Sequence, residues 1–392
     1  MMRDTDPWTL GVLYSLTGHT AISSKQHVQG ITLALEEINA RGGVLGRPLA
    51  ARIYDTESDL GRYRQYVDRL FADDGVDVVI GCCTSLSRKA VLPTIERRNG
   101  LLLYPDLYEG FEYSPNVLYA GAATNQNTLP LARHLLRGGA RRFVLVGSDY
   151  IYPRESNRVM RDLVERQGGQ VLDEIYLPLQ AGAARMAQLV ERVAALKPDI
   201  LFNALVGQSI CELLQACADA GVDGAFPIAS HNITEAEMLA LPKPPAAGHI
   251  TSAPFFSSLA TAPSRRFVAD FRRSFGARAP VSQIAAAAYS TVHLFALALE
   301  EAGEMDAQAI IAAACGRRFE APQGEIVVDA DNNHTWMTPR IGRWNGCDEF
   351  DIVWQAREAA QPDPWLVNYG GAETLADAEW ADLAEAEKEG IS

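Results

Sequence analysis

The chain has 392 residues, 48% hydrophobic and 21% charged, and at roughly 100–200 residues per domain this length predicts two or three domains. Such an ordinary composition excludes a disordered or fibrous chain. Because 49 Asp and Glu outnumber 35 Lys and Arg, the formal net charge is −14, and nucleic acids and anionic membrane surfaces are poor direct partners.

Short apolar runs alternate with longer helical patterns along most of the chain. This alternation is typical of βαβ units, in which helices join parallel strands. The expected strands are Leu10–Leu16, Leu49–Tyr54, Val76–Ile80, Leu101–Tyr104, Phe143–Val146, Val171–Ile175, Ile200–Asn203, Phe226–Ala229 and Ile250–Ala253. The expected helices are Ser23–Asn39, Arg62–Asp73, Arg88–Arg98, Gln126–Arg137, Arg154–Gln167, Arg185–Leu196, Ser209–Ala220 and Ser264–Ser274.

The number of expected strands argues for two sheets. Single open sheets of nine or more parallel strands are uncommon, so two α/β lobes with about five strands each fit better. The first block reaches about residue 121, and the second runs from Phe143 to about residue 253. No low-complexity linker separates them, which is the pattern of a chain that crosses between lobes several times.

The last third of the chain has a different pattern. Beyond Phe255 it is mostly helical and then forms short strands; we expect helices Ile284–Ala302 and Ala307–Cys315, then strands Glu325–Asp329, Thr335–Trp344 and Ile352–Gln355. Residues 370–392 carry seven acidic side chains and one lysine. We expect a partly frayed acidic helix there, with a docking segment anchored by Trp380 and Leu383 as the alternative.

The sequence as given shows no secretory signal after its first residues, and no run reaches the ~18 apolar residues of a membrane span. Its cysteines lack the spacing of a disulfide framework; they are Cys82, Cys83, Cys211, Cys217, Cys315 and Cys347. These features favour a cytoplasmic protein with reduced thiols. A periplasmic location is the alternative if a signal peptide has been removed.

No motif marks an enzyme active site or a cofactor. The glycine-rich segment Gly42–Gly46 follows a helix instead of opening one, so it is not a phosphate-binding loop. The seven histidines show no metal-ligand spacing, and no serine nucleophile elbow is present. We therefore expect a non-enzymatic protein with neither metal nor cofactor.

Candidate binding residues follow the predicted strands of the first block, because open α/β sheets bind ligands at the carboxyl ends of their strands. One strand runs into Cys83, Thr84 and Ser85 just before a helix, whose first N–H groups can hold a carbonyl oxygen or an anion. Helix capping by Ser85 is a compatible alternative. The next strand ends in Tyr104 and Asp106, which combine an aromatic face with a carboxylate acceptor.

The second block has a similar strand end, where Gly147-Ser148-Asp149 leads into Tyr150 and Tyr152. Tyrosine-rich ends from two lobes would form an aromatic cage whose phenol hydroxyls orient a small ligand. Ordinary half-buried packing is the alternative for each tyrosine taken alone.

Seven short runs carry a family resemblance. They are residues 87–91 (SRKAV), 104–105 (YP), 108–116 (YEGFEYSPN), 125–127 (NQN), 147–157 (GSDYIYPRESN), 321–324 (APQG) and 332–334 (NNH). They resemble the amide receptors that negatively regulate bacterial aliphatic amidase operons, and also the urea and short-chain-amide binding proteins of ABC transporters. Both groups have the type I periplasmic-binding-protein fold, and the likeness spans roughly residues 8–370.

This resemblance implies a receptor with two α/β lobes, each a mainly parallel sheet flanked by helices, that closes on a small amide. Lobe 1 is expected over 7–121 and 257–332, lobe 2 over 122–256 and 333–370, and the acidic tail over 371–392. The implied ligand-binding residues are Ser85, Thr84, Cys83, Tyr104 and Asp106 in lobe 1, with Tyr150, Tyr152, Gly207 and Phe255 in lobe 2.

The resemblance also implies two alternative roles. As a cytoplasmic sensor, the chain would hold an RNA-binding antiterminator protein silent until the ligand releases it, and it would form a homodimer or a larger assembly. As the substrate-binding component of an ABC transporter, it would deliver urea, short-chain amides or an amidine- or guanidinium-like compound.

Two positions depart from the pattern of the amidase regulators. Asp106 stands where they have threonine, and Cys83 stands where an aromatic residue is expected. A buried carboxylate without a cationic partner is costly. Asp106 is therefore expected to point toward Arg88 or solvent, or to meet a ligand with several N–H donors or a positive charge. Neutral amides and cationic amidine- or guanidinium-like ligands are both candidates.

Overall fold

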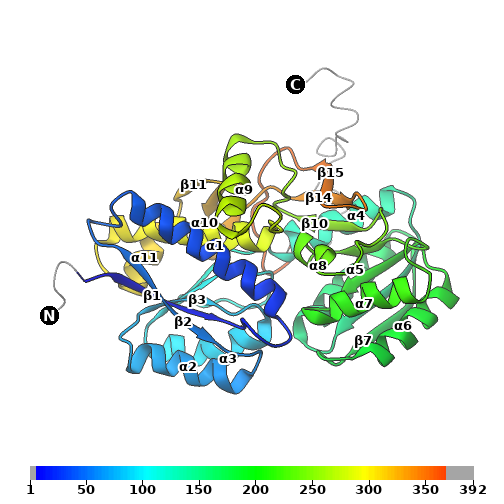
Figure 1. The fold of residues 1–392 in the computed structure, drawn as a ribbon, viewed down its shortest axis with the longest axis horizontal. Coiled ribbons are helices and arrows are strands. Elements are labelled where there is room, and N and C mark those ends of the chain that lie inside the picture. The colour runs from blue at the N-terminus through cyan, green and yellow to red at the C-terminus, as the bar shows by residue number, and fades with distance from the viewer. Residues whose placement is uncertain (1–5, 368–392) are drawn as a thin grey trace. The chain divides into compact units, whose positions relative to one another are not determined.

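The computed structural model describes residues 6–367, which form two compact units. The first unit contains residues 6–108, 112–121 and 261–336, and the second contains 109–111, 122–260 and 337–367. In each unit a mainly parallel sheet carries helices (Figure 1), which confirms the expected fold class. The expected lobe boundaries stay a prediction, and the expected acidic tail lies outside the described residues.

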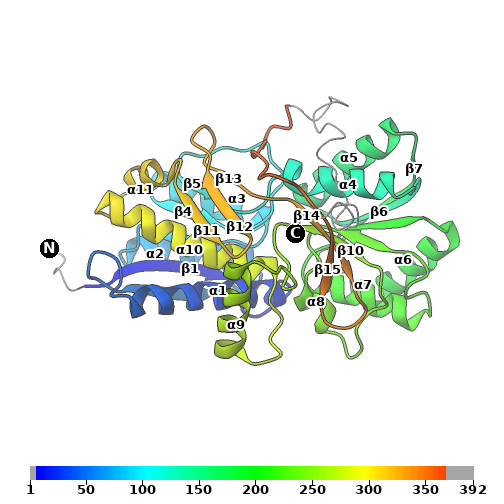
Figure 2. The same cartoon turned by 90° about the horizontal axis from the view of Figure 1, so that it is seen from above.

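The main sheet of the first unit has the strand order β2-β1-β3-β4-β5, and all neighbouring strands are parallel. Its strands are β1 (Trp8–Tyr14), β2 (Leu49–Asp55), β3 (Val78–Gly81), β4 (Leu101–Tyr104) and β5 (Val117–Tyr119). A small antiparallel sheet lies beside α10 (Figure 2) and contains β11 (Arg318–Ala321), β12 (Gly324–Val328) and β13 (Thr335–Trp336). Since β1, β3 and β4 are parallel neighbours, the loops that follow them adjoin at one edge.

Helices cover both faces of this sheet. An apolar core on one face joins the strands to α1 (Ala21–Ala40), α10 (Gln283–Ala302) and α11 (Ala307–Ala314), and a second core on the other face includes α2 (Leu60–Ala72) and α3 (Ser85–Arg97). The remaining helix, α9 (Ala262–Phe275), also contacts α1. Helix α1 packs closely on α10 at Gly30. The absence of a Cβ there permits this approach, since a Cβ at Gly30 would lie 2.2 Å from the carbonyl oxygen of Ala285.

The sheet of the second unit has the order β15-β14-β10-β9-β8-β6-β7 within the described residues. Its strands are β6 (Arg142–Ser148), β7 (Gln170–Leu177), β8 (Ile200–Ala204), β9 (Ile228–Ser230), β10 (Ile250–Ala253), β14 (Arg340–Trp344) and β15 (Phe350–Gln355). Strands β6 to β10 are parallel to one another, whereas β14 pairs in the antiparallel sense with both β10 and β15.

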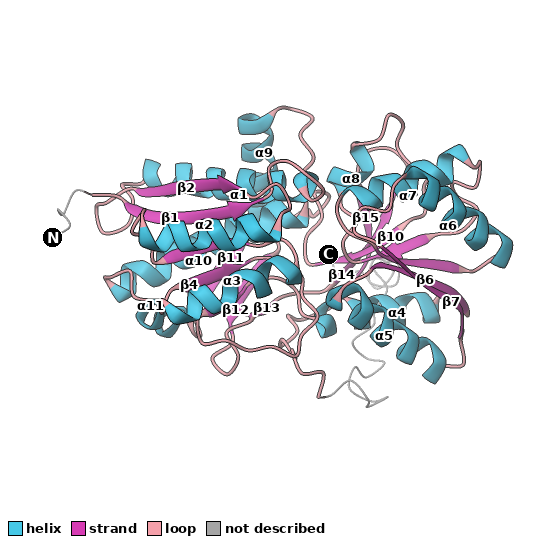
Figure 3. Cartoon of the chain, turned by 90° about the horizontal axis from the view of Figure 1, so that it is seen from below, coloured by secondary structure: helices cyan, strands magenta, loops and turns pink. Residues whose placement is uncertain are grey.

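Helices also cover both faces of the second sheet (Figure 3). One core includes α4 (Thr128–Arg137) and α5 (Ile151–Arg166), and the other includes α6 (Ala183–Leu196), α7 (Gln208–Asp219) and the short α8 (Glu235–Leu239). A 3-10 turn, Thr124–Gln126, precedes α4. None of the helices in residues 6–367 is both long and apolar enough to cross a membrane.

The structure corrects one strand prediction. The single strand expected over Thr335–Trp344 is two strands, β13 and β14, which belong to different sheets and different units. Pro339 lies between them and has no N–H to donate to a sheet, so one continuous strand is disfavoured there.

Candidate functional site

Buried and half-buried polar side chains meet at the carboxyl edge of the first unit's main sheet. Tyr14 ends β1, Cys83 and Thr84 follow β3, and Asp106 follows β4. His27 reaches the same edge from α1. Three strand ends and one helix therefore supply a polar cluster of the kind that open α/β sheets use for ligands.

Asp106 pairs with His27 in this cluster. Its Oδ2 lies 3.2 Å from His27 Nε2, and its Oδ1 accepts a hydrogen bond from the backbone N–H of Leu107 at 3.0 Å. The other ring nitrogen of His27, Nδ1, lies 3.0 Å from the carbonyl oxygen of Ser23, and the ring stacks on Tyr14 with centroids 4.5 Å apart. The side chain of His27 is fully buried, while that of Asp106 is 14% exposed.

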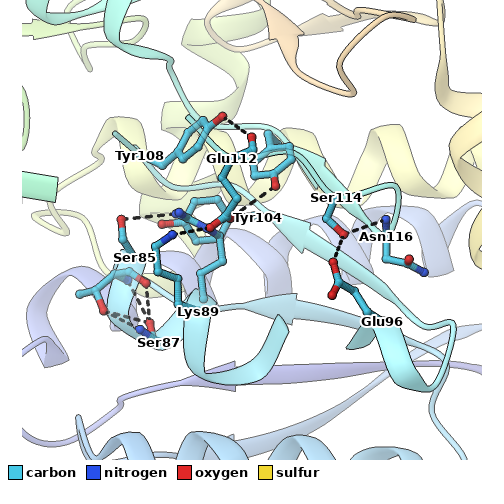
Figure 4. Close-up of polar contacts among 12 residues, drawn as sticks. Ser85, Ser87, Lys89, Glu96, Tyr104, Tyr108, Glu112, Ser114 and Asn116 are labelled. Atoms are coloured by element: carbon cyan, nitrogen blue, oxygen red, sulfur yellow. Dashed lines mark hydrogen bonds and ion pairs between the residues drawn. The ribbon is translucent and has the colours of Figure 1, made fainter. Parts of the chain in front are cut away.

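Arg88 is not the partner of Asp106, so that sequence-based alternative is wrong. Its buried guanidinium pairs instead with Glu112, with Nε and Oε1 2.7 Å apart, and Lys89 Nζ lies 2.6 Å from Oε2 of the same carboxylate. The guanidinium also lies 4.9 Å from the centre of the Tyr104 ring. Figure 4 shows Lys89 and Glu112 beside Tyr104. Burial tends to raise the pKa of Glu112, but the two cations outweigh burial and hold the pKa below its ordinary value.

The first turn of α3 borders the cluster. Thr84 caps the helix: its Oγ1 accepts from the N–H of Ser87 at 3.2 Å, while Ser87 Oγ accepts from the N–H of Thr84 at 3.1 Å. Ser85, the first helical residue, is buried, and its Oγ accepts from Arg88 Nη1 at 3.4 Å. The first N–H groups of a helix have no acceptor within it, so this turn suits an oxygen atom of a ligand.

Cys83 contributes a neutral thiol to the cluster. Its Sγ accepts a hydrogen bond from Ser24 Oγ at 3.6 Å. Burial, and next the negative charge of Asp106, raise the pKa of Cys83 to about 12. The thiolate is therefore scarce at neutral pH, and the thiol offers a ligand only a weak polar contact.

None of the six cysteines, all of which lie in the described part of the chain, forms a disulfide bond. Cys347 is the exposed cysteine, whereas burial raises the pKa of the other five, to about 12 for Cys83, Cys211 and Cys217. We expect one thiol of the native protein to react rapidly with Ellman's reagent at pH 8, and Cys347→Ser to remove that phase. A second rapid thiol would contradict the burial of the other five cysteines. Unfolding in guanidinium should make all six thiols reactive.

Tyr104 lies deeper than its neighbours at the edge. It ends β4, is fully buried in an apolar core, and donates its hydroxyl hydrogen to the carbonyl oxygen of Leu107 at 3.2 Å. Its hydroxyl therefore holds the loop that contains Asp106. A direct contact between Tyr104 and the ligand stays a prediction.

In the second unit, the predicted residues also lie at the carboxyl edge of the sheet. Tyr150 follows β6 and precedes α5, and Gly207 follows β8 with a φ of 59°, a backbone conformation that favours glycine. The N–H of Val206 donates to Ser148 Oγ at 3.3 Å, which ties the two loops together. Phe255 follows β10 and is fully buried.

Tyr152 has a partner that the sequence did not indicate. Its hydroxyl lies 2.8 Å from Nδ1 of His231, which follows β9, and the rings of Tyr150 and Tyr152 lie 6.4 Å apart. Burial lowers the pKa of His231 to about 3, so its imidazole is neutral at physiological pH. The spacing of histidines in a sequence indicates metal ligands but not pairing with single side chains. The sequence therefore did not indicate the contacts of His27 and His231.

The comparisons with known proteins define the class of this chain. Residues 8–370 match the family described as a periplasmic binding protein domain, and the chain belongs to that family. It is 22% identical over 333 residues to the Leu/Ile/Val-binding protein homolog 6 of Brucella melitensis, covering 83% of this chain and 84% of the relative. It is 23% identical over 332 residues to the leucine-, isoleucine-, valine-, threonine- and alanine-binding protein of Pseudomonas aeruginosa, covering 80% and 83%.

Two solved structures illustrate the shared fold. A solute-binding protein of an ABC transporter from Rhodopseudomonas palustris HaA2, in complex with p-hydroxybenzoic acid, has a TM-score of 0.82 at 20% identity, covering 92% of this chain and 99% of its own. The branched-chain amino acid transporter substrate-binding protein of Streptococcus pneumoniae, in complex with isoleucine, has a TM-score of 0.75 at 19% identity, covering 91% and 100%.

Proposed function

We propose that this chain is a receptor for a short amide-like molecule, such as acetamide or urea, and that it acts as the substrate-binding component of an ABC transporter. Membership of the periplasmic binding protein family supports a binding role. The transport role is supported by the similar solved structures, which are described as solute-binding proteins of ABC transporters. In this role the protein works outside the cytoplasmic membrane.

The amide proposal rests on one observation in the first unit: hydrogen-bond donors, the first N–H groups of a helix, lie beside a carboxylate acceptor. The first turn of α3, with Thr84 and Ser85, follows β3, and the carboxylate of Asp106 follows the adjacent β4. An amide group offers one carbonyl oxygen and up to two N–H donors. Helix N–H groups fit the oxygen, and a carboxylate fits the N–H donors.

Calorimetric titration with acetamide, urea, leucine and 4-hydroxybenzoate tests this proposal. We expect acetamide or urea to bind, and we expect Ser85→Ala and Tyr150→Phe each to weaken binding by about 1 kcal/mol, roughly fivefold, through loss of one hydrogen bond. Tyr113→Phe is the matched control, because Tyr113 is 49% exposed and lies in the loop that precedes β5. Binding of leucine or 4-hydroxybenzoate, without acetamide or urea, would contradict the amide proposal.

A second role rests on the runs over 108–116 and 147–157, which resemble the amidase regulators as well as the amide-binding proteins of ABC transporters. In that role the protein stays in the cytoplasm, as a homodimer or larger assembly, and holds an RNA-binding antiterminator protein until ligand arrives. Cell fractionation followed by affinity purification separates the two roles. A cytoplasmic protein that co-purifies with an RNA-binding partner and releases it on addition of acetamide supports regulation.

A further inference from the structure

Two fully buried polar atoms of the first unit form no hydrogen bond with any atom of residues 6–367. They are the hydroxyl oxygen of Tyr14, the last residue of β1, and Nε2 of His27 in α1. The neighbouring phenol of Tyr63, by contrast, has a partner, since its hydroxyl lies 3.2 Å from Ser15 Oγ. A polar atom that is buried without a partner loses its hydration and gains no bond in exchange, so each of the two atoms favours a ligand atom that can hydrogen-bond.

These two atoms adjoin the proposed amide site. The ring of Tyr14 stacks on the imidazole of His27, with the two planes inclined by 18°. His27 Nδ1 lies 3.0 Å from the carbonyl oxygen of Ser23, and Nε2, on the other side of the ring, lies 3.2 Å from Asp106 Oδ2. Burial, and next the nearby Asp106 carboxylate, raise the pKa of Tyr14, so its phenol is neutral at physiological pH. Tyr14 and His27 therefore border the carboxylate on which the amide proposal rests.

We propose that Tyr14 and His27 contact the ligand directly, as an inner subsite for a second polar group, and that the receptor therefore prefers urea to acetamide. This inference rests on the proposed function and deepens it, because it chooses between the two ligands named there. Urea and acetamide are nearly equal in size and shape. Urea has an NH2 group where acetamide has a methyl group, so the pair of ligands reports on the polarity of this subsite alone.

The preference follows from the hydrogen bonds that each ligand offers. The Asp106 carboxylate and the first turn of α3 bind one amide group, and the other end of the ligand meets Tyr14 and His27. An imidazole nitrogen accepts a hydrogen bond when bare and donates one when protonated, so Nε2 is polar in either state. The second NH2 group of urea donates to the Tyr14 oxygen, whereas the methyl group of acetamide would leave that oxygen buried without a partner. A site that hydrogen-bonds one end of its ligand rejects an analogue that lacks this bond for the same reason.

Calorimetric titration with urea and with acetamide at pH 7 tests this inference. We expect wild-type protein to bind urea about tenfold more tightly than acetamide, or more, which corresponds to one buried hydrogen bond. In Tyr14→Phe the affinity for urea should fall about tenfold while that for acetamide changes little, so the preference is lost. His27→Phe keeps an aromatic ring against Tyr14 and removes both nitrogens. It should also narrow the preference, and it decides the matter if Tyr14→Phe does not fold.

The melting temperature of the ligand-free protein separates a binding role of Tyr14 from a structural one. Because its hydroxyl bonds to no atom of residues 6–367, Tyr14→Phe should leave the melting temperature unchanged or raise it. Tyr63→Phe is the matched control. It removes a buried hydroxyl that has a partner in Ser15, so it should lower the melting temperature and keep the preference for urea.

Three results overturn the role of Tyr14 and His27 while the proposed function stands. One is equal or tighter binding of acetamide by wild type. Another is a full preference for urea in both Tyr14→Phe and His27→Phe. The third is a lower melting temperature of Tyr14→Phe with an unchanged preference, which shows that the hydroxyl bonds to a buried water and not to the ligand. If neither urea nor acetamide binds wild type, and leucine or 4-hydroxybenzoate does, the proposed function fails and this inference fails with it.

Discussion

Replacing Arg88 with methionine should lower the free energy of unfolding by about 3–5 kcal/mol, because it removes one partner of a buried ion pair. The Arg88 side chain is fully buried and Glu112 is only 13% exposed, so water cannot replace the guanidinium. Methionine keeps an apolar side chain of similar length and removes the guanidinium, which lies over the Tyr104 ring and donates to Ser85 Oγ. Urea denaturation followed by circular dichroism measures this loss.

Lys89→Met is the matched control, since Lys89 contacts the same carboxylate but is 45% exposed. Exposed ion pairs contribute about 0–1 kcal/mol, so this variant should stay close to wild type. Equal losses in the two variants would show that burial of Arg88 does not decide the effect.

The same pair predicts a pH dependence. The pKa of Glu112 is held below its ordinary value of 4.5, so the stabilisation is present above that pH and is lost as pH falls through the lowered pKa. The stability difference between wild type and Arg88→Met should therefore shrink in acid.

Replacing Glu235 with glutamine should raise the free energy of unfolding by about 3 kcal/mol at pH 8 and change it little at pH 4. Burial raises the pKa of Glu235 from 4.5 to about 7, so the folded protein keeps a proton that the unfolded chain loses near pH 4.5. Wild-type stability from this group therefore falls as pH rises from 4.5 to about 7 and is constant above. Glutamine keeps the carbonyl acceptor for the N–H of Ser257, which lies 3.1 Å from Glu235 Oε1.

Urea denaturation at pH 4, 6 and 8 follows this effect, with Glu191→Gln as the control. Glu191 is exposed, so its replacement should leave the pH dependence unchanged. A wild-type stability that rises between pH 5 and 8 in step with Glu235→Gln would contradict the buried, protonated carboxyl.

Elements with a strong local pattern were predictable from the sequence. Strands β4 and β10 begin and end at the predicted residues. For β4 the reason is that a strand buried on both faces is a continuous apolar run. The sequence did not indicate β5, β11 or α8. Strand β5 has 3 residues and α8 has 5, too few to show a periodic pattern of apolar residues. Strand β11 has exposed charged side chains.

The candidate site was predictable only in part, and for a physical reason. Asp106 follows a strong strand, so the rule that ligands bind at carboxyl ends identifies it. Its pairing with His27 depends on how α1 packs over the sheet, and no local pattern records that packing. The pairing of Arg88 with Glu112 likewise depends on the loop after β4 returning over α3.

The contact between Gly30 and Ala285 has a consequence for how the chain is made. A ribosome releases α1 long before α10, and the strands β6 to β10 of the second unit emerge in the interval. The apolar face of α1 therefore stays uncovered until α10 is made, while the sheet of the second unit assembles. The sheet of the second unit is completed only when β14 and β15 emerge, and these strands follow β13, the last strand of the first unit. The order of synthesis thus interleaves the completion of the two units.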